Sequence, residues 1–153
     1  RGNQLVGVER KFAFELGNVK VSGSIDWLEL TSENKFYIVD LKTGKSKVSA
    51  EDAKTNKQLQ VYQLAVLENG FDPKLENNSV AGAELVFVGD HEAKSAAVRS
   101  QVAIDAEQVK TDLLNSAAGM SAARFTAKIN DRCRTCSLKS SCPIQPQGRR
   151  VIE

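Results

Sequence analysis

Two long β-type segments at the start of the chain are separated by only two residues. Residues 5–16 and 19–30 are rich in β-branched and aromatic side chains, and Gly17-Asn18 between them is a typical turn sequence. This spacing predicts an antiparallel hairpin. A third apolar run, residues 36–42, follows a polar connection and extends the hairpin to a three-stranded meander.

A helix is predicted after the third strand. Ser49 has the character of an N-cap, acids follow in the first turn, and neither Pro nor Gly interrupts the chain before Gly70. We therefore expect one helix of about five turns with Gly70 at its C′ position. The apolar residues of its second half cover a wide arc, as in a helix that packs onto a sheet.

The rest of the core is predicted as two strands and a helix. A polar loop over residues 71–79 leads to strands at 80–89 and 97–104, and a helix over 105–118 follows with Asp105 as its N-cap. The order β-β-β-α-β-β-α predicts an α/β sandwich in which helices flank a central mixed β-sheet.

Length and charge bound the class of protein. The chain has 153 residues, of which 41% are hydrophobic, as expected for a single folded domain. The net charge of +2 is too small to identify a partner. No stretch reaches the length of a membrane span and no signal segment opens the chain, so we expect a soluble, cytoplasmic protein with no membrane partner.

The three cysteines lie close together near the C-terminus. Cys133, Cys136 and Cys142 have the spacing C-x2-C-x5-C, and none has a distant partner with which to form a disulfide framework. This density favours a metal or cluster site over three free buried thiols. The spacing alone does not separate zinc with a further ligand from an iron–sulfur cluster.

Two acids and a lysine are predicted to share one face of the second hairpin. If the turn is centred near Glu33, Asp26 lies directly opposite Asp40, and directly opposed residues project from the same face. The two-residue period of a strand adds Lys42 to that face. Two carboxylates held close in an apolar setting resist ionisation unless a cation neutralises them.

A hard divalent cation is the partner that this set favours. Mg²⁺ binds one or two carboxylates together with water and phosphate oxygens, and the carbonyl of Leu41 is a further candidate ligand. A lysine beside the metal helps to activate water or stabilises charge on a phosphate, so the set predicts phosphodiester hydrolysis. The alternative is a chance D-x-K whose acids are solvated at the strand ends.

Two residues of the predicted helix extend this site. Gln58 and Tyr62 are four residues apart and therefore share a helical face, from which an amide and a phenol can hydrogen-bond water, the lysine or a phosphate. The alternative is that Tyr62 is a core aromatic residue and Gln58 an exposed helix former.

Four segments in this order resemble the RecB-like nuclease domain of the PD-(D/E)xK superfamily. They are VSGSIDWL (21–28), FYIVDLKTG (36–44), QLQVY (58–62) and C-x2-C-x5-CP (133–143). The resemblance covers nearly the whole chain and is greatest to the C-terminal nuclease module of bacterial AddAB- or AdnAB-type helicase–nucleases, with Cas4-type exonucleases more distant. It implies a restriction-endonuclease-like fold and DNA cleavage that depends on Mg²⁺ or Mn²⁺.

The resemblance also implies roles for individual residues. Asp26 and Asp40 are the expected metal ligands and Lys42 the catalytic lysine, while Gln58 and Tyr62 form the helix motif of this branch. Glu9 stands where relatives often carry an acid and is a weaker candidate ligand.

The cysteines resemble the C-terminal part of a four-cysteine site that holds a [4Fe–4S] cluster, and the fourth cysteine is absent from this chain. We therefore expect a fragment of a longer helicase–nuclease, with a nuclease core at residues 1–123 and a basic tail at 124–153. A cluster would hold the tail so that it presents cations to DNA phosphates. The predicted DNA-binding residues are Lys45, Arg124, Lys128, Arg132, Arg134 and Lys139.

The expected biological role is exonucleolytic processing of double-strand breaks in recombinational repair, with a helicase in the same polypeptide or in a partner subunit. Two alternatives are a catalytically silent domain that binds DNA or acts as a scaffold in such a complex, and a stand-alone Cas4-like exonuclease.

Overall fold

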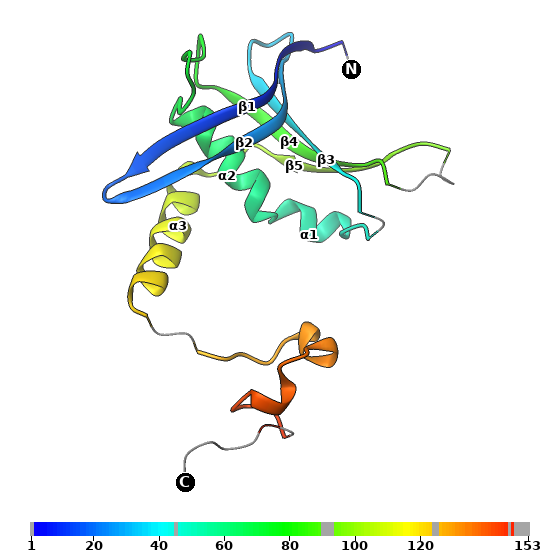
Figure 1. The fold of residues 1–153 in the computed structure, drawn as a ribbon. Coiled ribbons are helices and arrows are strands. Elements are labelled where there is room, and N and C mark those ends of the chain that lie inside the picture. The colour runs from blue at the N-terminus through cyan, green and yellow to red at the C-terminus, as the bar shows by residue number, and fades with distance from the viewer. Residues whose placement is uncertain (1, 45, 90–93, 124–125, 147, 149–153) are drawn as a thin grey trace. The chain divides into compact units, whose positions relative to one another are not determined.

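The computed structural model describes residues 2–44, 46–89, 94–123, 126–146 and 148 (Figure 1). Contacts within the chain divide it into two compact units, Arg1–Leu114 and Asn115–Glu153. The predicted boundary between residues 123 and 124 stays a prediction.

The first unit is built on a five-stranded mixed sheet. Its strands are β1 (Gln4–Leu16), β2 (Val19–Leu30), β3 (Phe36–Lys42), β4 (Val80–Phe87) and β5 (Ala97–Val102), and they lie side by side in this order (Figure 1). β3 and β4 run parallel, whereas every other neighbouring pair is antiparallel. The predicted mixed α/β fold is confirmed, although β4 and β5 each end earlier than expected.

The turn between β1 and β2 has the two residues that the sequence predicts. Leu16 pairs directly with Val19, and Gly17 adopts a φ of +59°. Glycine adopts this left-handed conformation without the steric cost that a Cβ atom brings. The long hairpin is therefore set by local chemistry.

The helical region after β3 is not the single helix that we expected. It consists of α1 (Ala50–Lys54) and α2 (Lys57–Leu67), and the chain turns between them at Thr55 and Asn56. Asn56 has an extended backbone, and its side chain accepts a hydrogen bond from the amide of Leu59, as an N-cap does. The prediction failed because Asn caps a new helix without help from Pro or Gly.

The C-terminus of α2 also differs by one residue from the prediction. Asn69, with a φ of +47°, occupies the C′ position, and its amide donates to Val66 while that of Gly70 donates to Ala65. This is a Schellman motif with Asn in the left-handed position. Gly70 is needed for another reason: its carbonyl accepts from Ala13 of β1, and a Cβ atom on it would lie 2.9 Å from the Ala13 carbonyl oxygen.

α3 (Ala106–Ser121) begins as the sequence predicts, because the Asp105 side chain accepts from the amides of Glu107 and Gln108. An ion pair of 2.6 Å between Lys57 and Asp112 joins the first half of α3 to α2. A second one, 2.9 Å long, joins Lys110 and Glu68.

The core of the first unit lies between the sheet and the helices that cover one of its faces (Figure 1). The loop over residues 71–79, expected to be polar, also contributes Phe71 and Leu75 to this core. Its fully buried apolar residues from the strands and α2 include Ile25, Leu28, Ile38, Leu59, Leu64, Ala65, Val66 and Ala83.

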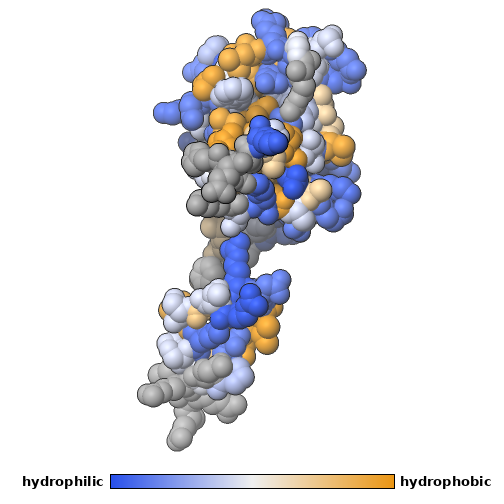
Figure 2. Space-filling model, turned by 90° about the vertical axis from the view of Figure 1, so that its right-hand side faces the viewer, coloured by the Kyte–Doolittle hydropathy of each residue, from blue (hydrophilic) through white to orange (hydrophobic). Residues whose placement is uncertain are grey.

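The second unit contains two short 3₁₀ helices, at Asp131–Thr135 and Lys139–Ser141. Hydrophilic side chains occupy much of its visible surface, with apolar patches between them (Figure 2). Ile129 and Leu138 are among the exposed apolar residues. Of the helices in the described ranges, none is both long and apolar enough to cross a membrane.

Candidate active site

The two predicted acids lie on neighbouring strands at the same level of the sheet. β2 and β3 pair through Trp27–Val39 and Leu28–Ile38, and one further step in this register places Asp26 opposite Asp40. The turn is therefore centred where the sequence argument put it. Asp40 lies near the C-terminal end of β3, two residues before Lys42.

Asp40 is a buried carboxylate that lies beside a lysine. Its side chain is 2% exposed, and its Oδ2 lies 2.6 Å from Lys42 Nζ. Burial raises the pKa of the Asp40 carboxyl above its usual value, the charge of Asp26 acts in the same direction, and Lys42 opposes both. This carboxylate needs a cation to be stable in its ionised form.

Asp26 is fixed against β3 by the backbone. Its Oδ2 accepts a hydrogen bond of 2.8 Å from the amide of Leu41, the residue between Asp40 and Lys42. In the β2–β3 register it stands opposite Asp40, and directly opposed residues project from the same face of the sheet. Both acids thus face the same region.

A series of polar contacts runs from β3 to α2. Lys42 Nζ, which lies beside Asp40, also donates to Gln58 Oε1 at 2.7 Å, and Gln58 Nε2 donates to the Tyr62 hydroxyl oxygen at 2.8 Å. The i, i+4 spacing of Gln58 and Tyr62 on α2 makes the last contact possible. Four of the five predicted catalytic residues are therefore joined directly.

Tyr62 is both a core aromatic and a site residue, so the two alternatives for it are not exclusive. Its ring packs edge-on against Phe12, with 5.9 Å between centroids. Burial raises the pKa of the Tyr62 phenol, which the Gln58 hydrogen bond lowers and the charges of Asp40 and Asp26 raise further. The phenol is therefore protonated at neutral pH and keeps an O–H donor.

The donor set formed by Asp26 and Asp40 fits a hard divalent cation. It offers carboxylate oxygens, the ligands that Mg²⁺ and Mn²⁺ prefer, and the Asp40 carboxylate is buried, so water does little to stabilise its charge. Glu9 is not brought to this point: it is exposed on β1, where Ser24 Oγ lies 3.4 Å from its Oε2. Across the described ranges, no three Asp, Glu, His or Cys side chains are grouped so as to hold a metal ion.

The same observation applies to the cysteines of the second unit. Cys133 Sγ accepts a bond from the Asn130 amide at 3.4 Å, while Cys136 is exposed and Cys142 is half-buried. As placed, the three thiols do not form a site for a metal or a cluster.

The predicted DNA-binding cations of the second unit are mostly exposed. Lys128, Arg132 and Arg134 are exposed, and Lys139 is half-buried with its Nζ bound to the Arg134 carbonyl. The remaining two, Lys45 and Arg124, lie outside the described residues.

The sequence analysis did not identify two buried side-chain amides that join α2 to β5. Gln63 is fully buried and Gln101 of β5 is 3% exposed, and the two side chains are hydrogen-bonded at 2.9 Å. No sequence signal links them, because a Gln in an amphipathic helix or an alternating strand is usually read as solvent-exposed.

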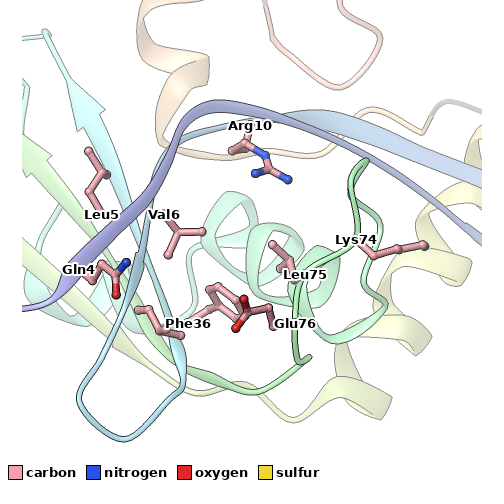
Figure 3. Close-up of a pocket in the computed structure, with 9 residues that line it drawn as sticks. Gln4, Leu5, Val6, Arg10, Phe36, Lys74, Leu75 and Glu76 are labelled. Atoms are coloured by element: carbon pink, nitrogen blue, oxygen red, sulfur yellow. The ribbon is translucent and has the colours of Figure 1, made fainter.

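A pocket of about 410 Å³ lies away from these residues, at the Phe36 end of β3 (Figure 3). Leu5, Val6 and Leu75 line it together with Arg10, which donates to the carbonyl of Pro73. None of the predicted catalytic residues lines this pocket.

The fold and the site together define a class of α/β protein in which two acids and a lysine lie close together on two neighbouring strands. Such a site is suited to phosphodiester hydrolysis. The sequence matches the PD-(D/E)XK nuclease superfamily over residues 1–143, and the chain belongs to this superfamily. Membership implies nuclease, and thus hydrolase, activity, which in this superfamily generally uses Mg²⁺ or Mn²⁺.

A solved structure supports the fold. The crystal structure of SSO0001 is similar to this chain with a TM-score of 0.52 and 15% sequence identity, over 91% of this chain and 61% of that one. This likeness concerns the fold alone. The chain thus spans less than two thirds of that protein's length. No curated protein matches the sequence significantly.

Proposed function

We propose that the protein is a Mg²⁺- or Mn²⁺-dependent deoxyribonuclease that acts as an exonuclease. We place it in the cytoplasm as the RecB-like nuclease domain of an AddAB- or AdnAB-type helicase–nuclease, which processes double-strand breaks for recombinational repair. The observation that carries the proposal is the contact series Asp40–Lys42–Gln58–Tyr62, with Asp26 on the adjoining strand. These contacts would not be expected if the D-x-K sequence occurred by chance and its acids were solvated at the strand ends.

Asp26 and Asp40 are the residues that hold the metal in this proposal, and the Leu41 carbonyl is a candidate third ligand. When bound, the metal supplies positive charge for the phosphate and lowers the pKa of water. The burial of Asp40 matters here, because a poorly solvated carboxylate gains more from a nearby cation than an exposed one does.

Lys42 is held so that its ammonium group has a defined direction. An ammonium group has three N–H bonds, and the Asp40 carboxylate and the Gln58 amide oxygen lie close enough to orient two of them. The third is available to a phosphate oxygen. Since its side chain is 33% exposed, Lys42 meets the solvent from which DNA arrives.

Tyr62 serves as a neutral donor in the same region. Its oxygen accepts from Gln58, and no residue in the described part of the chain accepts its O–H proton. A half-buried phenol with a raised pKa donates a hydrogen bond to a phosphate without losing its proton.

The basic tail and the cluster belong to the proposal for a longer chain. The cations of residues 128–139 would add contacts to DNA phosphates that weaken as salt increases. Three cysteines need a fourth to complete a [4Fe–4S] site. Measurement of iron and acid-labile sulfide in a version of the protein extended upstream tests this part separately.

The substrate tests separate the proposed exonuclease from an endonuclease and from the catalytically silent domain. Purified protein is incubated with end-labelled linear DNA, single- and double-stranded, and with covalently closed circular DNA, in Mg²⁺, Mn²⁺ or EDTA. The proposal predicts metal-dependent loss of linear DNA with sparing of circles. Cleavage of circles contradicts exonuclease action, and binding without cleavage in any metal favours the silent DNA-binding domain.

A further inference from the structure

The corner between α1 and α2 is held by one side chain from β5. Gln101 Nε2 lies within hydrogen-bond distance of three backbone carbonyls: those of Ala53 at 2.9 Å, Lys54 at 3.1 Å and Asn56 at 3.2 Å. Carbonyls at the end of a helix lack partners within that helix. Ala53 and Asn56 also accept backbone bonds, from Asn56 and Gln60, so Gln101 adds a side-chain contact on both sides of the corner and supplies the donor for Lys54.

A second amide ties this corner to the body of α2. Gln63 Nε2 donates to Gln101 Oε1 at 2.9 Å and also lies 3.2 Å from the Val102 carbonyl. Both side chains are buried, so water does not compete readily for these bonds. On the same strand, Arg99 donates to the Val48 carbonyl just before α1, so β5 holds this region at several points.

The corner leads directly to the proposed catalytic residues. Gln58 is the second residue of α2, in the turn whose amides have no partners within the helix. This turn must be placed so that Gln58 Oε1 stays 2.7 Å from Lys42 Nζ. We propose that Gln101, supported by Gln63, is a positioning residue that holds the first turn of α2 and so sets the place of Gln58 and Lys42.

This inference rests on the proposed nuclease function and is tested by a double-mutant cycle. Gln101→Met keeps the length of the side chain and removes its hydrogen bonds. Because misplacement by about 1 Å can cost about 100-fold in rate, we expect kcat on linear DNA to fall by about 10- to 100-fold with apparent KM nearly unchanged. In a Gln58→Ala background the same change should cost no more than about twofold.

A merely structural role gives a different result. Val109→Ala truncates a buried apolar residue of α3 and removes none of the side-chain hydrogen bonds of Gln101 or Gln63, so it should lower stability without lowering kcat of the folded protein. Equal loss of kcat from Gln101→Met in both backgrounds overturns the proposal, and so does an unchanged kcat. If Gln101→Met does not fold, Gln63→Met is measured in the same cycle.

Hydrogen exchange makes the test independent of activity. The Gln60 amide donates to the Asn56 carbonyl at 3.1 Å in the first turn of α2, whereas the Glu68 amide lies at the other end of the helix. In Gln101→Met, exchange at Gln60 should accelerate more than exchange at Glu68. If the parent protein lacks nuclease activity, the proposed function fails, and exchange at Gln60 still decides whether Gln101 holds the corner.

Discussion

Replacement of Asp40 by Asn should stabilise the metal-free protein. A buried polar group that is incompletely satisfied costs about 1–3 kcal/mol, and Asp40 is such a group, because it is 2% exposed and its burial raises its pKa in spite of Lys42. The ion pair with Lys42, which is 33% exposed, offsets about 1 kcal/mol or less of this cost. We therefore expect a gain of about 1 kcal/mol, or about 2–4 °C in Tm for a domain of this size.

The pH dependence of stability follows from the same carboxylate. Because folding raises the pKa of Asp40, the folded state binds a proton more tightly than the unfolded state. Stability of the parent therefore falls as the pH rises from the ordinary pKa of Asp through the raised value. Asp40→Asn lacks this loss, so the difference between the two proteins should be largest at neutral pH.

Metal should reverse the order of stability. A metal that binds only the folded state adds about 2.7 kcal/mol to the free energy of unfolding when its concentration is 100 times its Kd. Asp40→Asn removes a metal ligand and should therefore lose this stabilisation. The assay is thermal unfolding in EDTA and in Mn²⁺, with Glu33→Gln in the exposed β2–β3 turn as the control. The reasoning is refuted if Asp40→Asn is less stable than the parent in EDTA, or if Mn²⁺ stabilises both equally.

Three further changes test separate parts of the account. Lys42→Ala should lower the cleavage rate by about 10²–10⁴-fold while DNA binding, measured by fluorescence anisotropy, persists; cleavage at the parent rate contradicts the role of Lys42. Tyr62→Phe keeps the packing on Phe12 and should lower the rate by about tenfold with little change in denaturant midpoint; an unchanged rate removes the phenol from the mechanism. Gly70→Ala should destabilise the fold by about 1–3 kcal/mol, because the new Cβ meets the Ala13 carbonyl. Gly119→Ala is the control, because a new Cβ atom on this residue of α3 meets no other atom, and it should not destabilise the fold. Equal destabilisation by the two substitutions would contradict the close approach of Gly70 to β1.

The parts of the fold that depend on local chemistry were predictable from sequence. Gly17 supplies the left-handed residue of the first turn, and Ser49 and Asp105 cap the helices that follow them. The register of β2 against β3 follows from the short turn at residues 31–35, and this register brought Asp26 and Asp40 to one level. Spacing on a helix likewise placed Gln58 beside Tyr62.

The remaining features depend on contacts between distant parts of the chain. Asn56 is a good N-cap, but the break there is also held by Gln101, 45 residues later, whose side-chain amide donates to carbonyls on both sides of it. Gly70 looked like a helix terminator, whereas it is required by close packing on β1. The periodicity of a sequence does not predict contacts between residues that are far apart in the chain.

Cleavage by the parent and by Asp40→Asn, measured on end-labelled linear DNA in Mg²⁺ and in EDTA, tests the central claim most directly. The account predicts rapid degradation by the parent in Mg²⁺ and none in EDTA. It predicts no degradation by Asp40→Asn, although that variant is at least as stable as the parent without metal. Equal cleavage by the two proteins in Mg²⁺ would contradict the assignment of Asp40 as a metal ligand and with it the proposed active site.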